Sequence, residues 1–172
     1  MQEEGIQANN YTFVSLFKAC GATRDLKRGR NLHVDACKMG LELDGFIVNT
    51  LVSMYGKCGA ILEAECVFNG MYHRNIVSWT ALIAGYARHG RDEIVMDLFD
   101  KMVEEGLEPN HITYTIVLNV CSHSGLLEKG QMYFRSMKTI YRIVPTFEHY
   151  TCMVDLFARA GQFEKAMEVI ER

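Results

Sequence analysis

Cysteine and histidine are residue types that can bind metals, and cysteines can also form redox pairs. The 172-residue sequence contains six of each. A zinc site or a redox pair would need closely spaced ligands such as a C-x-x-C motif. None of the cysteines forms such a motif or lies beside a cluster of histidines. We therefore expect free thiols in a reducing compartment, each serving as a small buried residue. The residues are Cys20, Cys37, Cys58, Cys66, Cys121 and Cys152, and His33, His73, His89, His111, His123 and His149.

The sequence offers little support for catalysis. No Ser-His-Asp or Cys-His arrangement stands out, and the histidines fall at unrelated positions of the repeat described below. We expect no catalytic residue, no metal and no cofactor, and hence no enzyme.

Charge and hydropathy narrow the classes of partner. The formal net charge is −3, so a nucleic-acid binder of this sequence would have to carry its positive charge locally. No apolar run approaches the ~18 residues of a membrane span. Residues Met1 to Asn9 are polar and acidic instead of signal-like. We expect no membrane partner, and any targeting segment to lie outside these residues.

The elements that would position functional side chains follow from one pattern that recurs five times. An aromatic or apolar residue is followed by apolar residues three, four and seven positions later, which places four apolar side chains on one helical face. The copies are offset by 35, 31, 35 and 36 residues, too long for a single helix, so each unit must contain a second element. The copies begin at Phe13, Val48, Trp79, Tyr114 and Tyr150.

Each unit is predicted to be a helical hairpin. A glycine follows every first helix but the earliest, where a tight turn can use its freedom at positive φ, and a second amphipathic stretch comes next. Small residues recur at one place in that stretch and let the two helices approach closely, although Val95 breaks the rule. The turn glycines are Gly59, Gly90, Gly125 and Gly161, and the small residues are Gly29, Ala64, Gly130 and Ala166.

A single hairpin cannot bury both faces of its helices, so neighbouring hairpins must stack. The predicted fold is all-α, a right-handed α-solenoid superhelix of antiparallel helix-turn-helix repeats that binds an extended partner along one face. The sequence begins with what looks like the tail of a hairpin and stops in a second helix at Arg172. We therefore expect a truncated fragment whose uncapped apolar ends could self-associate.

The residues resemble the pentatricopeptide repeat family, and in particular its plant subfamily in which long, short and standard repeats alternate. Motifs that carry the resemblance include Met54-Tyr55-Gly56-Lys57-Cys58-Gly59 and Gly106-Leu107-Glu108-Pro109-Asn110. The resemblance covers residues 1–172 as a single repeat domain. Its parts are the tail of a truncated repeat at 1–9, a long-type repeat at 10–44, a short-type repeat at 45–75, a standard repeat at 76–110, a second long-type repeat at 111–146 and an incomplete short-type repeat at 147–172.

This resemblance implies binding of single-stranded RNA in a mitochondrion or chloroplast, with one base per repeat. Two side chains select each base in that family, one in the first helix just after the aromatic and one at the end of the repeat. Asn49 with Asn75 looks like the cytosine-preferring pair, with uracil next, and Thr80 with Asn110 looks like the adenine pair. A terminal asparagine can accept from the exocyclic amino group that cytosine and adenine carry. The implied core is C or U followed by A, read 5′ to 3′.

The other repeats carry weaker base-selecting pairs. Val14 with Asp44 places an aliphatic group where a hydrogen-bonding residue belongs, and Thr115 with Thr146 is outside the clear combinations. Thr151 has no partner within the sequence.

Two further sets are implied by the resemblance. Residues at the second position of adjoining repeats hold the bases between them, a role that Glu148 does not fit. A basic residue near the end of each first helix can meet phosphates. The base-sandwiching residues are Tyr11, Phe46, Val77 and Ile112, and the phosphate-contacting residues are Lys57, Arg88, His123 and Arg159.

Other interpretations stay open. Asn49, Thr80 and Thr115 could be solvated residues on an exposed helical face, and the recurring cations could simply offset helix macrodipoles. The resemblance favours the recognition part of a C-to-U RNA editing factor, without the deaminase domain of many relatives, because its H-x-E and P-C-x-x-C motifs do not occur. The alternatives are a scaffold for protein interactions like the tetratricopeptide repeats, or a platform on which the long-type repeats dock partner editing factors.

Overall fold

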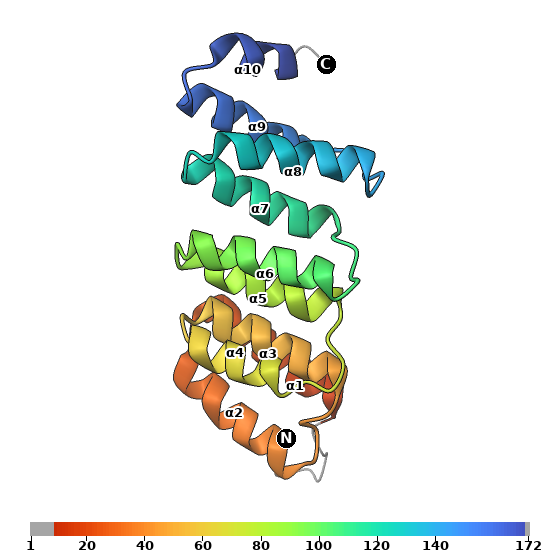
Figure 1. Ribbon diagram of the computed structural model, residues 1–172. Coiled ribbons are helices and arrows are strands. Elements are labelled where there is room, and N and C mark those ends of the chain that lie inside the picture. Colours follow the sequence, from red (N-terminus) through yellow and green to blue (C-terminus); the bar gives the residue numbers. More distant parts are fainter. Residues whose placement is uncertain (1–8, 171–172) are drawn as a thin grey trace. The chain divides into compact units, whose positions relative to one another are not determined.

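The computed structural model describes residues 9–170, and this part of the chain is all-α, with ten helices and no strand (Figure 1). The predicted tail at 1–9 lies outside the described residues except for Asn9. The helices are α1 (Asn10–Thr23), α2 (Leu26–Lys38), α3 (Gly45–Lys57), α4 (Ile61–Asn69), α5 (Ile76–Arg88), α6 (Asp92–Glu104), α7 (His111–His123), α8 (Leu127–Thr139), α9 (Phe147–Arg159) and α10 (Phe163–Ile170).

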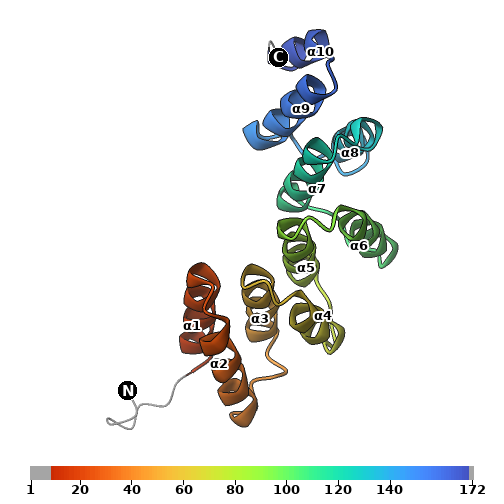
Figure 2. The ribbon, with the colours of Figure 1, turned by 90° about the vertical axis from the view of Figure 1, so that its left-hand side faces the viewer.

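The helices group into two compact units, one ending at His89 and one starting at Gly90. In the first unit α1, α3 and α5 pack in a row, while α2 covers α1 and α3, and α4 covers α3 and α5 (Figure 2). In the second unit α7 packs on α9, α6 covers α7, α8 covers both α7 and α9, and α10 covers α9. Each unit is therefore built from an inner layer of odd-numbered helices and an outer layer of even-numbered ones.

The core of each unit is made by the recurring apolar pattern. In α5, Trp79, Leu82, Ile83 and Tyr86 are all buried, and the corresponding residues of α3 and α7 are buried as well. Each odd helix presents this stripe to the even helices that cover it, as the 3.6-residue period requires. The sequence pattern therefore predicted both the helices and the faces that they bury.

The turns inside the hairpins also follow the prediction. Gly59, Gly90, Gly125 and Gly161 all have positive φ, between 62° and 82°. The earliest hairpin has no glycine at this place, and there Arg24 takes the left-handed conformation, with a φ of 56°. A non-glycine residue tolerates that conformation at some cost, so the turn itself is required by the hairpin.

The small residues of the even helices make room for more than their partner helix. A methyl group added at Gly29 would come within 2.6 Å of Met54 Sδ, on the first helix of the following repeat, while Cys20 Cβ of its own hairpin is 3.8 Å away. At Gly130 the added methyl group would likewise meet Leu156, also on the following first helix. The small residue thus serves the packing of one repeat on the next as well as the hairpin.

α3 and α5 approach each other closely. A methyl group added at Gly56 would lie 3.1 Å from the backbone Cα of Gly85. Because neither residue has a side chain, the two backbones come close together. Glycine at both positions therefore allows this close spacing of α3 and α5.

Candidate functional site

The odd helices begin at residues 10, 45, 76, 111 and 147, so the predicted base-selecting residues at the ends of repeats lie immediately before a helix. They act as N-caps, a position at which Asn, Asp, Ser and Thr are preferred. Asp44 Oδ1 accepts from the backbone N–H groups of Phe46 at 2.9 Å and Ile47 at 3.1 Å. Asp44 therefore has a structural task independent of any ligand.

The capping bonds decide which atoms of Asn75 and Asn110 remain available. Asn75 Oδ1 accepts from Val77 N at 2.9 Å and Ser78 N at 3.1 Å. Asn110 Oδ1 accepts from Thr113 N at 3.0 Å and Thr113 Oγ1 at 3.1 Å. A carbonyl oxygen has two lone pairs, so both oxygens are fully used. The expectation that this oxygen accepts from a base amino group is thus corrected, and the amide Nδ2 is the group that is left.

The second member of each predicted pair is the fifth residue of an odd helix. Val14, Asn49, Thr80 and Thr115 are half-buried, and Thr151 is exposed. Asn49 differs from the threonines in its hydrogen bonding: its Oδ1 is buried, and among the described residues nothing donates to it. A buried acceptor without a donor costs about 1–3 kcal/mol, so Asn49 is poised to gain a partner.

Two contacts show that these positions lie side by side within a unit. Asn10 Nδ2, at the start of α1, donates to Asp44 Oδ2, which caps α3. In the second unit, His149 in the first turn of α9 reaches Thr115, the fifth residue of α7. The cap of one odd helix therefore adjoins the first turns of the odd helix before it, and by the same register Asn75 adjoins the N-terminal part of α3.

The predicted base-sandwiching residues are apolar yet exposed. Tyr11 and Phe46 are 83% and 81% exposed, and Val77 and Ile112 are 56% and 50% exposed. Each is the second residue of an odd helix, beside the caps. Exposed apolar side chains thus recur at the same place in the first four odd helices. Glu148, at the same place in α9, instead accepts from Thr146 Oγ1 at 2.6 Å.

The predicted phosphate-contacting residues are all exposed and lie at the opposite ends of the odd helices. Lys57, Arg88, His123 and Arg159 are the last residues of α3, α5, α7 and α9. Eight residues separate Asn49 from Lys57, which is about 12 Å along the axis. Arg159 Nε also donates to Asp155 Oδ2 at 2.8 Å, and hydrogen bonds from Ser122 and from Arg159 lower the pKa of that carboxyl group.

The described residues contain no group of three or more His, Cys, Asp or Glu side chains placed to hold a metal ion. All six cysteines are free thiols. Among the described helices, none combines the length and the apolar character that crossing a bilayer would demand.

His149 is the polar residue of this region that the sequence analysis missed. It is the third residue of α9 and is fully buried, and the third residues of α5 and α7, Ser78 and Thr113, are fully buried too. The position recurs as a buried polar residue after the cap, which is a signal that the spacing of histidines alone conceals.

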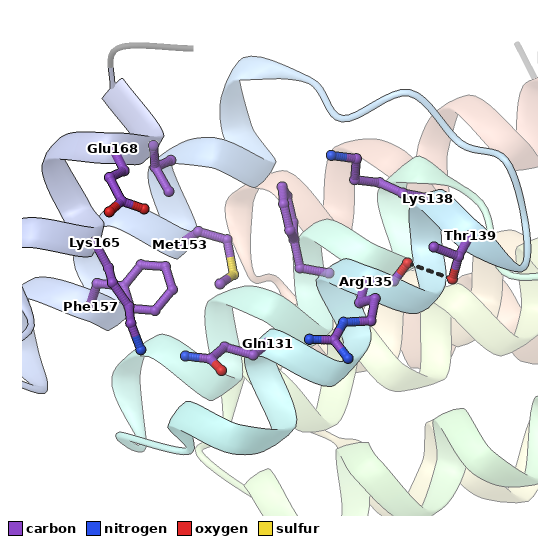
Figure 3. Close-up of a pocket in the computed structure, with 10 residues that line it drawn as sticks. Gln131, Arg135, Lys138, Thr139, Met153, Phe157, Lys165 and Glu168 are labelled. Carbon is purple, nitrogen blue, oxygen red and sulfur yellow. Dashed lines mark hydrogen bonds between the residues drawn. The ribbon is translucent and has the colours of Figure 1, made fainter.

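A groove of about 370 Å³ lies on the outer layer of the second unit, between α8 and α10 with α9 as its floor (Figure 3). Lys138 lies over the ring of Phe134, with Nζ 5.7 Å from the ring centroid, and Lys165 lies over Phe157 at 6.0 Å. Arg135 adds a third cation. The groove is therefore basic and aromatic, and it is lined by none of the predicted RNA-contacting residues.

These features define an all-α helical-repeat protein whose inner helices carry paired polar residues at their N-terminal ends. The family model of the PPR repeat matches residues 46–76, 112–140 and 148–172, and that of the PPR repeat family matches residues 74–123. The chain belongs to the pentatricopeptide repeat family, which decides against the tetratricopeptide repeats as the family of these hairpins.

Known relatives agree with this assignment. Two pentatricopeptide repeat-containing proteins of Arabidopsis thaliana are each 45% identical over 99% of this chain, which covers 21% and 23% of their lengths. A third, named as chloroplastic, is 43% identical over 98% of the chain and is covered to 20%. The chain thus spans about a fifth of the curated relatives that it matches.

Solved structures share the fold. The pentatricopeptide repeat protein PPR10 from maize matches 99% of this chain with a TM-score of 0.75, at 22% identity and over 25% of its own chain. PPR10 in complex with an 18-nt psaJ RNA element matches 98% with a TM-score of 0.82, also at 22% identity and over 25% of that chain. The fold is therefore that of an α-helical repeat solenoid.

Proposed function

We propose that this chain binds single-stranded RNA sequence-selectively, one base per repeat. The observation that carries the proposal is the pairing in the first unit of a buried Asn49 Oδ1 that lacks a donor with a cap, Asn75, whose Nδ2 is the atom left over. Splayed single-stranded bases offer their Watson–Crick edges to such rigidly held side chains. The PPR10–RNA complex adds the support of a structural neighbour.

The remaining atoms favour cytosine at this repeat. Nδ2–H of Asn75 can donate to the unprotonated ring nitrogen N3 of cytosine, while the cytosine amino group supplies the donor that Asn49 Oδ1 lacks. Uracil carries a hydrogen on N3 and a carbonyl instead of the amino group, so both bonds are lost unless the Asn49 amide turns over. The same donor on Asn110 matches N1 of adenine and opposes N1–H of guanine, which supports the pairing of Thr80 with Asn110 that the sequence resemblance implies.

The exposed apolar residues and the cations suggest where the bases and the phosphates would lie along the odd helices. Exposed apolar residues such as Tyr11 and Phe46 would hold bases near the N-terminal ends of the odd helices. The cations at the C-terminal ends would meet phosphates where the macrodipole alone would repel them. A nucleotide together with an extended lysine side chain spans the distance of about 12 Å between Asn49 and Lys57.

A selection from a randomised RNA pool tests the proposal. We expect enrichment of C or U followed by A, read 5′ to 3′, and the absence of any enriched step would overturn base reading.

Asn75→Asp should shift the first base from cytosine toward uracil by about tenfold or more, because a carboxylate accepts from N3–H and cannot donate. Asn110→Asp should shift only the second base, from adenine toward guanine, so each variant is the control for the other. Both variants keep a good N-cap and should fold normally.

The cellular role that we propose is RNA processing in a mitochondrion or chloroplast, as the recognition part of a C-to-U editing factor. Relatives named as chloroplastic or mitochondrial support the compartment. The alternating offsets of 35, 31, 35 and 36 residues support the subfamily. Crosslinking the protein to RNA inside the organelle should recover sites with an edited cytidine downstream of a C/U–A step, and recovery of unedited transcripts alone would contradict the role.

A second candidate function is docking of a partner editing factor on the long-type repeat at 111–146. The basic, aromatic groove between α8 and α10 favours an acidic segment of that partner. A labelled peptide of alternating glutamate and phenylalanine should bind this chain and lose affinity with Arg135→Glu and Lys138→Glu together. Equal affinity for the variant would rule out the groove.

A further inference from the structure

The side chain of His149 joins two repeats in the second unit. Its Nδ1 lies 2.9 Å from the backbone N of Thr146, and its Nε2 lies 2.8 Å from the carbonyl oxygen of His111 and 3.1 Å from Thr115 Oγ1. His111 and Thr115 are on α7, 38 and 34 residues earlier in the chain. Its Nδ1 also lies 2.9 Å from Thr146 Oγ1, and the side chain is fully buried.

The donors and acceptors around the ring can be assigned from chemistry. A backbone N–H can only donate, so Nδ1 is the acceptor and the neutral ring carries its hydrogen on Nε2. That hydrogen points at the His111 carbonyl oxygen. Thr115 Oγ1 donates to the same carbonyl oxygen at 2.9 Å, and its lone pair therefore faces Nε2–H. The hydroxyl group of Thr115 is held on both its donor and its acceptor side.

The other member of this pair is also occupied. Thr146 Oγ1 lies 2.6 Å from Glu148 Oε2 and 2.9 Å from His149 Nδ1, and because both of these atoms are acceptors, its single hydrogen is used by one or the other. Unlike Asn75 and Asn110, a threonine cap has no amide Nδ2 left over. Both positions that would read a base in the repeat at 111–146 are thus committed to the protein.

The buried residue at the same place in α5, Ser78, makes its hydrogen bonds with the N-cap of its own helix. Ser78 Oγ accepts from Asn75 N at 2.9 Å and donates to Asn75 O at 2.8 Å, within its own capping box. Thr113 Oγ1 bonds to its own cap, Asn110, at 3.1 Å. The Ser78 hydroxyl group stays within its capping box, whereas the imidazole of His149 is long enough to reach the preceding first helix.

We infer that His149 is a specificity-determining residue that makes the repeat at 111–146 unselective. The repeat accommodates one nucleotide but does not distinguish between the four bases. The inference rests on the proposed function. The His149 side chain is long enough to engage Thr115. The pair of Thr115 and Thr146 therefore selects no base because of His149, and not only because both residues are threonines.

The test is selection from a randomised RNA pool with the wild-type chain and His149→Ser, which places at this position the residue that α5 has. The wild type should enrich the C/U–A step and show equal frequencies of the four bases at the next position. His149→Ser should leave the C/U–A step as it is and produce at least about a threefold preference for one base at the next position, since one net hydrogen bond is worth about 0.5–1.5 kcal/mol.

Thr115→Val separates a freed hydroxyl from a general change in packing. It should abolish the preference gained in the His149→Ser chain, and in the wild-type background it should leave the profile at that position flat. A wild-type preference that Thr115→Val removes would overturn the inference. So would a flat profile for a folded His149→Ser chain. If His149→Ser does not fold, His149→Asn keeps an acceptor for Thr146 N but is too short to reach α7, and the Thr115→Val comparison in the wild type decides alone.

The two proposals fail in different ways. If the wild type enriches no sequence, base reading itself is wrong and the inference falls with it. If the wild type enriches C/U–A and only the effect of His149→Ser is missing, the proposed function stands and the inference is wrong.

Discussion

Burial divides the six thiols into inner and outer groups. Cys20, Cys121 and Cys152 are buried, while Cys37 and Cys66 are exposed. Desolvation disfavours the charged thiolate, and it raises the pKa of Cys121 to about 12 and that of Cys152 to about 11. At pH 8 the thiolate fraction of Cys152 is therefore about one in a thousand, and that of Cys121 is lower still.

Alkylation should follow this division. A short treatment of the native chain with iodoacetamide at pH 8 should modify Cys37 and Cys66 and leave Cys121 and Cys152 unmodified, because the thiolate is the reactive species. Peptide mass spectrometry measures each site. All six should react alike in guanidinium chloride. Native modification of Cys121 as fast as Cys37 would mean that α7 is not buried as described.

At the residue scale, the sequence predicts positions better than atoms. The register of the repeat placed Asn75 and Asn110 directly before helices, where the structure has them. It did not reveal that capping uses Oδ1, because that depends on backbone N–H groups whose direction only the folded helix sets. His149 was missed for the same reason, since its bonds to His111 and Thr115 join residues distant in the sequence.

At the element scale, glycines set the distance between packed helices. Gly56 on α3 and Gly85 on α5 allow backbone-to-backbone contact, whereas Gly45 at the start of α3 has no atom within 4 Å of an added methyl group. The two glycines of α3 thus differ in surroundings, and the same substitution at each isolates the effect of helix packing.

Gly45→Ala should raise the stability of the chain by up to about 1 kcal/mol, because alanine restricts the unfolded chain and favours a helix. Gly56→Ala gains the same propensity but forces α3 and α5 apart, and overpacking of this kind costs about 1–3 kcal/mol. We therefore expect Gly56→Ala to lower the urea midpoint of unfolding and Gly45→Ala to leave it unchanged or higher. Equal midpoints for the two variants would show that the α3–α5 contact is looser than the structure has it.

Helices and hairpin turns were predictable because they depend on local patterns. An apolar residue every three or four positions requires a buried stripe, and a glycine after it permits the turn. Arg24 shows where that reasoning ends. Nothing in the sequence indicates its left-handed backbone in the earliest hairpin, because the positive φ is required by the hairpin turn and not favoured by arginine.

At the scale of the whole molecule, the chain is an acidic protein proposed to bind a polyanion. With a formal net charge of −3, favourable electrostatics must come from single cations, of which Lys57 is one. Contact with about two to four phosphates predicts a shallow salt dependence, because each contact with single-stranded RNA contributes about 0.7 to the slope.

Lys57→Gln should therefore lower the slope of log Kobs against log salt by about 0.7, as measured by filter binding between 50 and 200 mM salt, a range over which counterion release is well resolved. Glutamine keeps Cβ and Cγ and has its amide carbon in the place of Cδ, the Lys57 side-chain atom nearest to Gly21. The matched control is Lys27→Gln on α2, an exposed cation of the outer layer, which should leave the slope unchanged. A slope unaffected by Lys57→Gln would assign Lys57 to the helix macrodipole alone.

The residue that ends each repeat has two roles. It caps the helix that follows, and it is proposed to contact a nucleotide. Asp44, Asn75, Asn110 and Thr146 all begin a helix, and only a few side chains do that well. Folding therefore limits the residue types available for base recognition at this position to the small polar residues that cap helices. Among these few residues, exchanging asparagine for aspartate replaces the amide donor by a carboxylate acceptor at nearly constant shape. A single substitution can therefore change the base that a repeat prefers without changing how the repeat folds.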